Sequence, residues 1–462
     1  MSLQAALQPS SEKGIAKEDE HGLKERYESI YDRVDALVTD LSISEVAAVP
    51  ASYKIEVDLI LRITFALFRI GFPVYSSEVL LTKLADRFGL ELYISSKPTN
   101  VDINIKGEKR RQTLTTHYVV QLPHVLPGPF NLSAHCRYSY LVLDIIYGNV
   151  TIEDCYHRLF TLLASPSLVY PSWVYIVFGS VASSAMVTLF PQTTWVDASI
   201  AAFLGAFVQL CLLLSERSSL WLRPLKVYEF VVPFISAILT ATFAFFLQIS
   251  IEEALVSGVV WLLPGISITA GVLEVYNYHY EMGLSRLLFS ILVVVLIASG
   301  IKAGLKAVGV NQIEPPNFFD GPAFSFEFTL VSVPVMALAF AILYNLEVIH
   351  LPAFLITSMA AFYIERVARL ATAEFSVLIS AFVVGCLAML YNYLFHIPVI
   401  VLIIAGISFL VPGNLAVMGF VEGFEDEFIS VGESMLSVLQ IAVSISLGVS
   451  TPYVFFKNSR SF

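Results

Sequence analysis

Ten apolar stretches, each long enough to cross a lipid bilayer, follow one another from about residue 167 to the C-terminus. A helix of about 20 apolar residues spans the hydrocarbon core, because it satisfies its own backbone hydrogen bonds where water is absent. Charged residues make up only 14% of the chain. The expected spans are 168–190, 196–214, 227–249, 254–273, 284–301, 326–344, 349–364, 375–394, 398–421 and 433–456. We therefore predict a mostly α-helical, multi-pass membrane protein.

The part of the chain before residue 166 has a soluble character. Residues 1–50 predict a mostly disordered or helical tail without a secretory signal peptide. Residues 51–166 predict a small α+β domain, which precedes membrane units at 167–310 and 326–462 joined by a linker at 311–325. Apolar periodicity places the domain's helices at 55–70, 76–89, 132–147 and 151–164, and its strands at 90–94, 101–105 and 113–122.

Composition and motifs exclude several classes of function. A net charge of −11 without a basic stripe argues against nucleic-acid binding. The four cysteines lie far apart and predict neither a disulfide framework nor a zinc site. No nucleotide-binding, zinc-protease or nucleophile-elbow motif is present, so we predict no enzyme, metal or cofactor. The histidines of the first domain are scattered, and we interpret this domain as regulatory or scaffolding; they are His117, His124, His135 and His157.

The distribution of Lys and Arg predicts the orientation in the membrane. With the N-terminus inside, seven Lys and Arg residues near the spans fall in inner segments and four in outer loops. Positive residues are enriched on the cytoplasmic side of membrane proteins. Ten is an even number, so both termini are expected in the cytoplasm. The pattern does not distinguish the plasma membrane from an organelle membrane.

One motif occurs twice, in the fourth and ninth spans. The pattern is L-x-P-G-x5-G-x2-E, and its two copies are 148 residues apart. The copies are Leu262-Leu263-Pro264-Gly265 with Gly271 and Glu274, and Leu410-Val411-Pro412-Gly413 with Gly419 and Glu422. Five spans per half is an odd number, so the second half begins on the opposite side of the membrane. The two halves are therefore expected to form an inverted repeat, in which interrupted helices mark a binding site.

Each Pro-Gly pair is expected to break its helix near the middle of the membrane. Proline has no N–H, so Pro264 frees the carbonyl of Val260 and Pro412 that of Ser408. The half-helix that follows presents free N–H groups and a positive dipole end, which suit the carboxylate of an amino acid. The candidate substrate-binding residues are Pro264, Gly265, Ser267, Thr269, Gly271, Pro412, Gly413, Asn414 and Gly419. The alternative is that Pro-Gly only kinks each helix and that the glycines permit close packing.

Four carboxylates near the ends of spans are candidates for gating or proton coupling. Ionisable residues inside a membrane are functional candidates by default. Glu274 and Glu422 are expected at the two mouths of the path, and Asp197 and Glu327 near the ends of other spans. The alternative is that these side chains only anchor helix ends in the interface.

These motifs resemble the threonine/serine exporter family, which includes bacterial amino acid exporters and fungal pheromone-regulated membrane proteins. The first half resembles the family's N-terminal unit from about Ile55 to Gly304, and the second resembles the smaller partner unit from about Phe326. The resemblance implies a secondary active transporter that exports small amino acids such as threonine or serine, driven by a proton or membrane gradient. The second motif copy has Leu415 and Val417 in place of Ser267 and Thr269, so selective hydroxyls would come mainly from the first half.

Two other classes of function stay open. The chain could form a channel, or a membrane-anchored enzyme or scaffold whose first domain does the work. The expected partners are an amino acid and the lipid bilayer, and the sequence leaves open whether the protein is a homo-oligomer.

Overall fold

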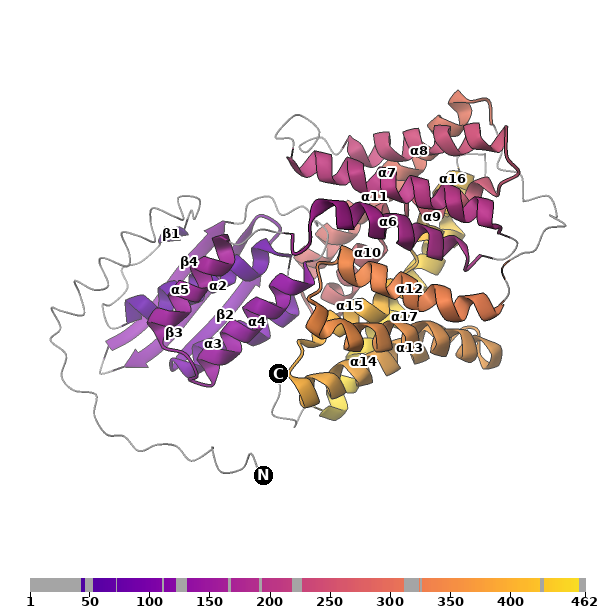
Figure 1. Ribbon diagram of the computed structural model, residues 1–462. Coiled ribbons are helices and arrows are strands. Elements are labelled where there is room, and N and C mark those ends of the chain that lie inside the picture. The colour runs from indigo at the N-terminus through magenta and orange to yellow at the C-terminus, as the bar shows by residue number, and fades with distance from the viewer. Residues whose placement is uncertain are drawn as a thin grey trace.

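We describe the protein from a computed structural model. The described residues are 43–45, 53–71, 73–109, 112–121, 131–164, 168–190, 193–217, 227–310, 324, 326–423 and 428–456. Figure 1 shows a small α+β domain, the front domain, beside a larger bundle of helices. Buried apolar residues of the front domain and of the bundle belong to one continuous cluster, so the two parts are packed together.

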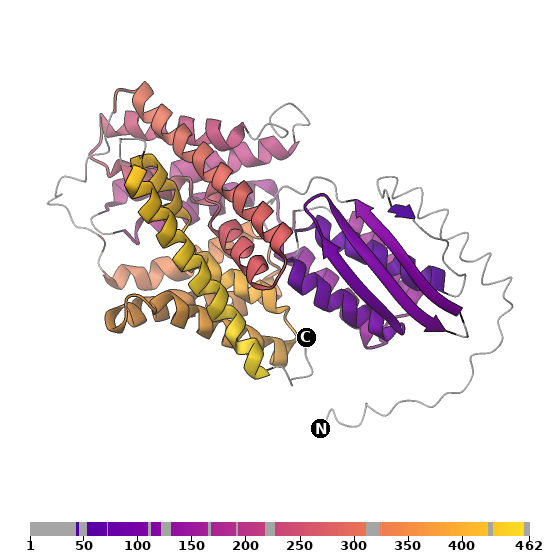
Figure 2. The ribbon, with the colours of Figure 1, turned by 180° about the vertical axis from the view of Figure 1, so that it is seen from behind.

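The front domain is a four-stranded antiparallel sheet with helices on one face. The strand order is β1-β4-β3-β2, and Figures 1 and 2 show the helices on one side of the sheet. Its elements are α2 (Lys54–Arg69), α3 (Val74–Arg87), β2 (Leu90–Ser96), β3 (Asn100–Lys109), β4 (Gln112–Gln121), α4 (Leu132–Ile146) and α5 (Ile152–Ala164). Alternate residues Val101, Ile103 and Ile105 of β3 are fully buried, which is the signature of a half-covered sheet. The helices and strands expected here from apolar periodicity are present.

One strand differs from the sequence expectation. Residues 26–50 carry helix-like spacing, yet β1 (Ile43–Glu45) pairs with β4, with Ile43 opposite Val120. A three-residue edge strand is too short to show a period of its own, so its partner decides its conformation. The other residues of the expected tail lie outside the described part of the chain.

The bundle contains a helix, or two consecutive helices, at each of the ten expected apolar stretches. The elements are α6 (Ser172–Val187), α7 (Trp195–Arg217), α8 (Tyr228–Ala244), α9 (Ile251–Gly258), η3 (Val260–Leu262), α10 (Gly265–Tyr276), α11 (Tyr280–Ala307), α12 (Phe326–Leu343), η4 (Val348–His350), α13 (Leu351–Ala371), α14 (Ser376–Phe395), α15 (Val399–Leu410), α16 (Gly413–Gly423) and α17 (Phe428–Phe456). Within the described chain, six segments are long and apolar enough to cross a membrane, and the pair α9 and α10, bent by 54°, would make seven. Helices α6, α8 and α12 are apolar but shorter. The protein is therefore a multi-pass membrane protein.

Two hydrogen bonds show the directions in which α6 and α12 run. At the end near the front domain, the backbone N–H of Leu132 in α4 donates to the carbonyl of Tyr344, which follows α12 (2.9 Å). At the far end, Thr188 after α6 donates to Ser332 in the second turn of α12 (2.7 Å). Helix α12 thus runs from the far end to the front-domain end, and α6 runs the opposite way.

The two halves of the bundle pack in matching ways. Helix α8 packs on α11 in the first half, and α14 packs on α17 in the second. A Cβ atom added to Gly300 of α11 would lie 2.4 Å from the backbone oxygen of Phe230 in α8. A Cβ atom added to Gly448 of α17 would lie 2.8 Å from the backbone oxygen of Leu378 in α14. Gly448 follows Gly300 by 148 positions, and Leu378 follows Phe230 by 148 positions, which is the spacing of the repeated motif.

We expect Gly300→Ala and Gly448→Ala to destabilise the protein to a similar extent. Each added methyl group would meet a backbone carbonyl, which cannot rotate away, so the paired helices must separate. Overpacking of this kind costs about 1–3 kcal/mol. The measurement is the thermal unfolding midpoint of the purified protein in detergent.

Gly432→Ala is the matched control, because Gly432 also lies in α17 but a Cβ atom there would meet open space. Its midpoint should equal or exceed that of the wild type, since alanine favours helix. Equal midpoints for all three variants would show that the glycine contacts are not close in the folded protein.

Candidate functional site

The two Pro-Gly breaks meet inside the bundle. A Cβ atom added to Gly265 would lie 3.0 Å from the backbone nitrogen of Gly413, and one added to Gly413 would lie 3.2 Å from the nitrogen of Gly265. Such a close approach of two backbones requires glycine at both positions. The structure thus brings together two segments that the sequence singles out separately.

At each break a new helix begins. The first intrahelical bonds run from Ile268 N–H to the carbonyl of Pro264 (2.9 Å) and from Ala416 N–H to that of Pro412 (3.0 Å). The N–H groups of residues 265–267 and 413–415 precede these bonds, as at every helix start. Two helix N-termini, with their positive dipole ends, therefore lie side by side.

One expectation about the first break is wrong. The carbonyl of Val260 is not left free by Pro264, because it accepts a hydrogen bond from the N–H of Leu263 (3.2 Å). The short 3-10 helix η3 supplies this donor and so satisfies the backbone before the break.

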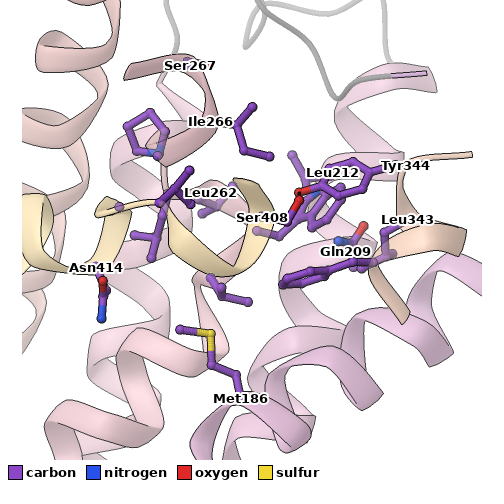
Figure 3. A pocket seen from close by; sticks show the side chains of 18 of the residues that line it. Met186, Gln209, Leu212, Leu262, Ile266, Ser267, Leu343, Tyr344, Ser408 and Asn414 are labelled. Carbon is purple, nitrogen blue, oxygen red and sulfur yellow. Dashed lines mark hydrogen bonds between the residues drawn. The ribbon is translucent and has the colours of Figure 1, made fainter. Parts of the chain in front are cut away.

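A cavity of about 330 Å³ lies at the meeting point of the breaks (Figure 3). Its lining comes from both halves of the bundle. Of the candidate binding residues, those that line the cavity are Pro264, Gly265, Ser267, Gly413 and Asn414, together with Ser408. Figure 3 shows Ser267, Ser408 and Asn414 around it.

Four candidate residues are not among the residues that line the cavity: Thr269, Gly271, Pro412 and Gly419. The Thr269 hydroxyl donates to the carbonyl of Gly265 within α10 (3.1 Å). A Cβ atom at Gly271 would lie 3.1 Å from the backbone oxygen of Gly283 in α11. The placement of Gly271 favours the packing interpretation, and a part in substrate binding stays a prediction.

Three buried polar residues that the sequence analysis did not select also line the cavity: Gln209 of α7, Glu229 of α8 and Asn345 after α12. Among the residues that the structure describes, the Gln209 side-chain nitrogen has no hydrogen-bond partner. Glu229 accepts from the Tyr228 hydroxyl (3.2 Å). A carboxylate at the start of an apolar span was a signal that could have identified Glu229.

A wall of aromatic side chains completes the cavity. The rings of Trp261 and Tyr344 are 5.0 Å apart between centroids, and those of Phe340 and Phe409 are 5.7 Å apart. The Ser408 hydroxyl lies 3.3 Å from the Tyr344 hydroxyl. These residues come from three separate segments of the chain, so no local sequence pattern predicts that they meet.

Two of the candidate coupling carboxylates lie away from the cavity. Asp197 is buried and accepts hydrogen bonds from the backbone N–H groups of Thr194 (2.7 Å) and Ser250 (2.8 Å), which ties the starts of α7 and α9 together. Glu327 is exposed in the first turn of α12. The side chain of Glu422 in α16 lies outside the described part of the protein. A role of these residues in coupling stays a prediction.

Glu274 is fully buried where the bundle meets the front domain. Its carboxylate lies 3.1 Å from the Arg286 guanidinium of α11 and accepts from the N–H of Val74, the first residue of α3 (3.5 Å). A second pair, His279 with Glu78, joins the same surfaces at 3.2 Å. Glu274 thus joins α10, one of the two broken helices, to the front domain.

The front-domain side of this contact is largely shielded from solvent. Burial, with a smaller contribution from the Glu274 carboxylate, raises the pKa of Tyr75 to about 12. Burial also lowers the pKa of His135 to about 4. Both groups are therefore neutral at pH 7. His117 and His157 lie on β4 and α5, and His124 lies outside the described residues, so no histidine cluster is seen in the part of the chain that is described.

We expect Glu274→Gln to destabilise the protein strongly, because it leaves the largely buried Arg286 guanidinium without its carboxylate. Breaking a buried ion pair costs about 3–5 kcal/mol. The measurement is the unfolding midpoint in detergent. Glu78→Gln should cost less than about 1 kcal/mol, because its pair with His279 is half-exposed.

The double variant Glu274→Leu with Arg286→Met separates charge from packing. Removal of both charges is often tolerated in a buried site, so this variant should be more stable than Glu274→Gln. A Glu274→Gln protein as stable as wild type would contradict the buried pair.

Comparison with known proteins gives a consistent family match. Residues 58–308 match the family model described as "Putative threonine/serine exporter", and residues 329–455 match that described as "Threonine/Serine exporter, ThrE". The two matched regions contain one copy each of the repeated motif. No solved structure matches the chain.

Several fungal proteins are similar to the chain. It is 25% identical over 380 residues to pheromone-regulated membrane protein 10 of Saccharomyces cerevisiae (strain YJM789), covering 77% of the chain and 46% of that protein. It is 24% identical over 411 residues to the protein of that name in Kluyveromyces lactis, covering 85% of the chain and 41% of the relative. For the Candida albicans (strain WO-1) protein of that name, identity is 23% over 299 residues, which cover 62% of the chain and 26% of the relative. The chain spans less than half the length of these relatives.

Proposed function

The chain belongs to the threonine/serine exporter family, and we propose that it is a secondary active transporter that exports small amino acids such as threonine or serine. The proposed substrate site is the cavity between the two breaks, and the driving force is a proton gradient or the membrane potential. One observation carries the proposal: both interrupted helices begin their second halves at a single cavity within the bundle.

The chemistry of this cavity suits an amino acid. Two helix N-termini offer backbone N–H groups and positive dipole ends for a carboxylate. Ser267, Ser408 and Asn414 offer polar atoms to a substrate hydroxyl, and the aromatic wall gives the rest of the cavity an apolar surface. Broken helices at the meeting of two repeats are the usual place for a transporter's site.

We further propose that all ten apolar segments cross the membrane as a five-plus-five inverted repeat. The matching glycine contacts of Gly300 and Gly448 support this arrangement, and so do the opposite directions of α6 and α12, the first helices of the two halves. Each broken helix then crosses the membrane once, with its break near the middle.

A channel, or an enzyme or scaffold carried by the front domain, is the alternative. A channel would pass ion current without saturable exchange, whereas a transporter would exchange labelled for unlabelled amino acid. Counterflow of radiolabelled serine, threonine and other amino acids in proteoliposomes separates these functions.

We expect Pro264→Ala and Pro412→Ala to insert normally into the membrane and to lose most counterflow. Alanine restores a backbone N–H and permits continuous helix across the break, which would withdraw the helix N-terminus from the cavity. The measurement is the initial rate of serine counterflow, normalised to protein in the vesicles.

A third proline offers a control. Pro334 lies inside α12 and is not among the residues that line the cavity, so Pro334→Ala should keep its rate. Wild-type rates in both break variants would instead show that the prolines are details of packing.

We expect both termini on the cytoplasmic side. The positive-inside count and the even number of proposed spans give this result. Tags at each terminus should react with impermeant reagents only after the membrane is opened.

Asn131 supplies an independent check, since it begins an Asn-x-Ser sequon and its side chain caps α4 by accepting from Ala134 N–H (3.0 Å). Efficient glycosylation of Asn131 or Asn149 in a eukaryotic host would reverse the proposed orientation.

A further inference from the structure

A buried glutamine of α7 lies in the wall of the cavity. Gln209 is 4% exposed, and it lines the cavity together with Gly265 and Gly413 of the two breaks (Figure 3). Within the described part of the chain, its side-chain nitrogen has no hydrogen-bond partner. A buried amide N–H that stays unpaired costs stability, so each such group needs an explanation. An acceptor that enters the cavity would supply the missing partner.

The aliphatic part of Gln209 lies between α6 and α7. A Cβ atom added to Gly179 of α6 would lie 2.2 Å from the Cγ atom of Gln209. The Gln209 stem therefore lies directly against the α6 backbone, where only glycine leaves room for it. The last torsion of a glutamine side chain is soft, so the amide can turn its N–H groups toward the cavity while the stem stays in place.

Contacts along α7 place Gln209 near the first break. The helices α7 and α9 start together, since the Asp197 carboxylate accepts from the N–H of Ser250 (2.8 Å). They run side by side in the same direction, because a Cβ atom at Gly258 would lie 2.5 Å from the Cβ atom of Leu204. Gln209 is five residues beyond Leu204, about 7.5 Å further along α7. This step brings it level with η3, which α7 contacts and which leads into the first break.

The missing partner is an acceptor, and this selects one group of the proposed substrates. Serine and threonine carry a carboxylate, an ammonium group and a hydroxyl. The ammonium group only donates hydrogen bonds, so it cannot pair with an amide N–H. The carboxylate is the group proposed to bind at the helix N-termini. The hydroxyl oxygen can accept from Gln209 while it donates its own proton elsewhere.

A neighbouring polar side chain cannot take this part. The Ser408 hydroxyl donates to the carbonyl of Ile404 within α15 (2.6 Å), so its single proton is used inside the protein. Ser408 can accept from a ligand hydroxyl, whereas Gln209 can donate to one. The two side chains line the cavity from different halves of the bundle.

We infer that the Gln209 amide donates a hydrogen bond to the side-chain hydroxyl of the substrate and so selects serine or threonine over alanine. This inference rests on the proposed transport function, which it deepens by naming the residue that recognises the substrate side chain. A site built to bind a hydroxyl discriminates against an analogue without one, because the polar group of the site is then left unpaired.

Competition between serine and alanine in proteoliposomes tests this assignment. In the wild type, L-serine should inhibit counterflow of labelled serine at a concentration about tenfold lower than L-alanine, the effect of one hydrogen bond to a buried donor. Gln209→Met replaces the amide by an apolar group of similar length, and it should lower this ratio at least about fivefold. Gln440→Met is the matched control, because Gln440 is exposed in α17 and is not among the residues that line the cavity, and it should keep the wild-type ratio.

Thermal unfolding in detergent supplies a readout that does not depend on transport. Without ligand, the midpoint of Gln209→Met should equal or exceed that of the wild type, because the variant removes an unpaired buried amide. L-serine should raise the wild-type midpoint more than L-alanine does, and Gln209→Met should lose this difference. A lower midpoint together with an unchanged serine-to-alanine ratio would make the amide a structural group and overturn the inference.

The remaining outcomes separate the inference from the function on which it rests. Equal loss of affinity for serine and alanine in Gln209→Met would show that the amide binds the carboxylate, which would overturn the assignment to the hydroxyl. Absence of any amino acid counterflow by the wild type would overturn the proposed function. In that case, stabilisation by serine over alanine that Gln209→Met loses would still support the hydroxyl site, and its absence from the wild type or its persistence in the variant would reject it.

Discussion

The backbone of a membrane protein must satisfy its own hydrogen bonds, and the two Pro-Gly breaks are where this requirement shapes the structure. A broken helix cannot face lipid, because its free N–H and carbonyl groups would be left in hydrocarbon. Here each break is placed against the other, and glycine at both positions lets the two backbones approach within contact distance. Before the first break, the carbonyl of Val260 in the short helix η3 accepts a hydrogen bond from the N–H of Leu263. What stays available are the N–H groups at the starts of α10 and α16, and these adjoin the cavity.

The same constraint explains why the cavity is polar at one place and apolar elsewhere. Helix N-termini, Ser267 and Asn414 provide polarity at the breaks, where the backbone itself is irregular. The surrounding wall of Trp261, Phe340 and Phe409 is what an apolar bundle supplies by default. Gln209 and Glu229 are exceptions to that default, since both are buried polar side chains on otherwise apolar helices.

The front domain is attached to a helix that begins at the cavity. Helix α10 begins at the first break and ends near Glu274, which pairs with Arg286 and caps the start of α3. One short helix therefore touches the cavity at its start and the front domain near its end. The contact of Glu274 with Arg286 and Val74 therefore connects the cavity physically to the front domain.

The sequence by itself determined the membrane class, the positions of the apolar helices and the two matched breaks, because hydrophobic length, proline and glycine act locally on the chain. It also placed most strands and helices of the front domain, where periods of two and of 3.6 are visible in the residues. Only the tertiary structure decided that the breaks adjoin, that Gly271 lies close to α11, and that Glu274 is buried under the front domain. It alone assembled the aromatic wall, Gln209 and Glu229 around one cavity. These features depend on contacts between residues far apart in the chain, and neither composition nor spacing along one helix records which distant surface a side chain will meet.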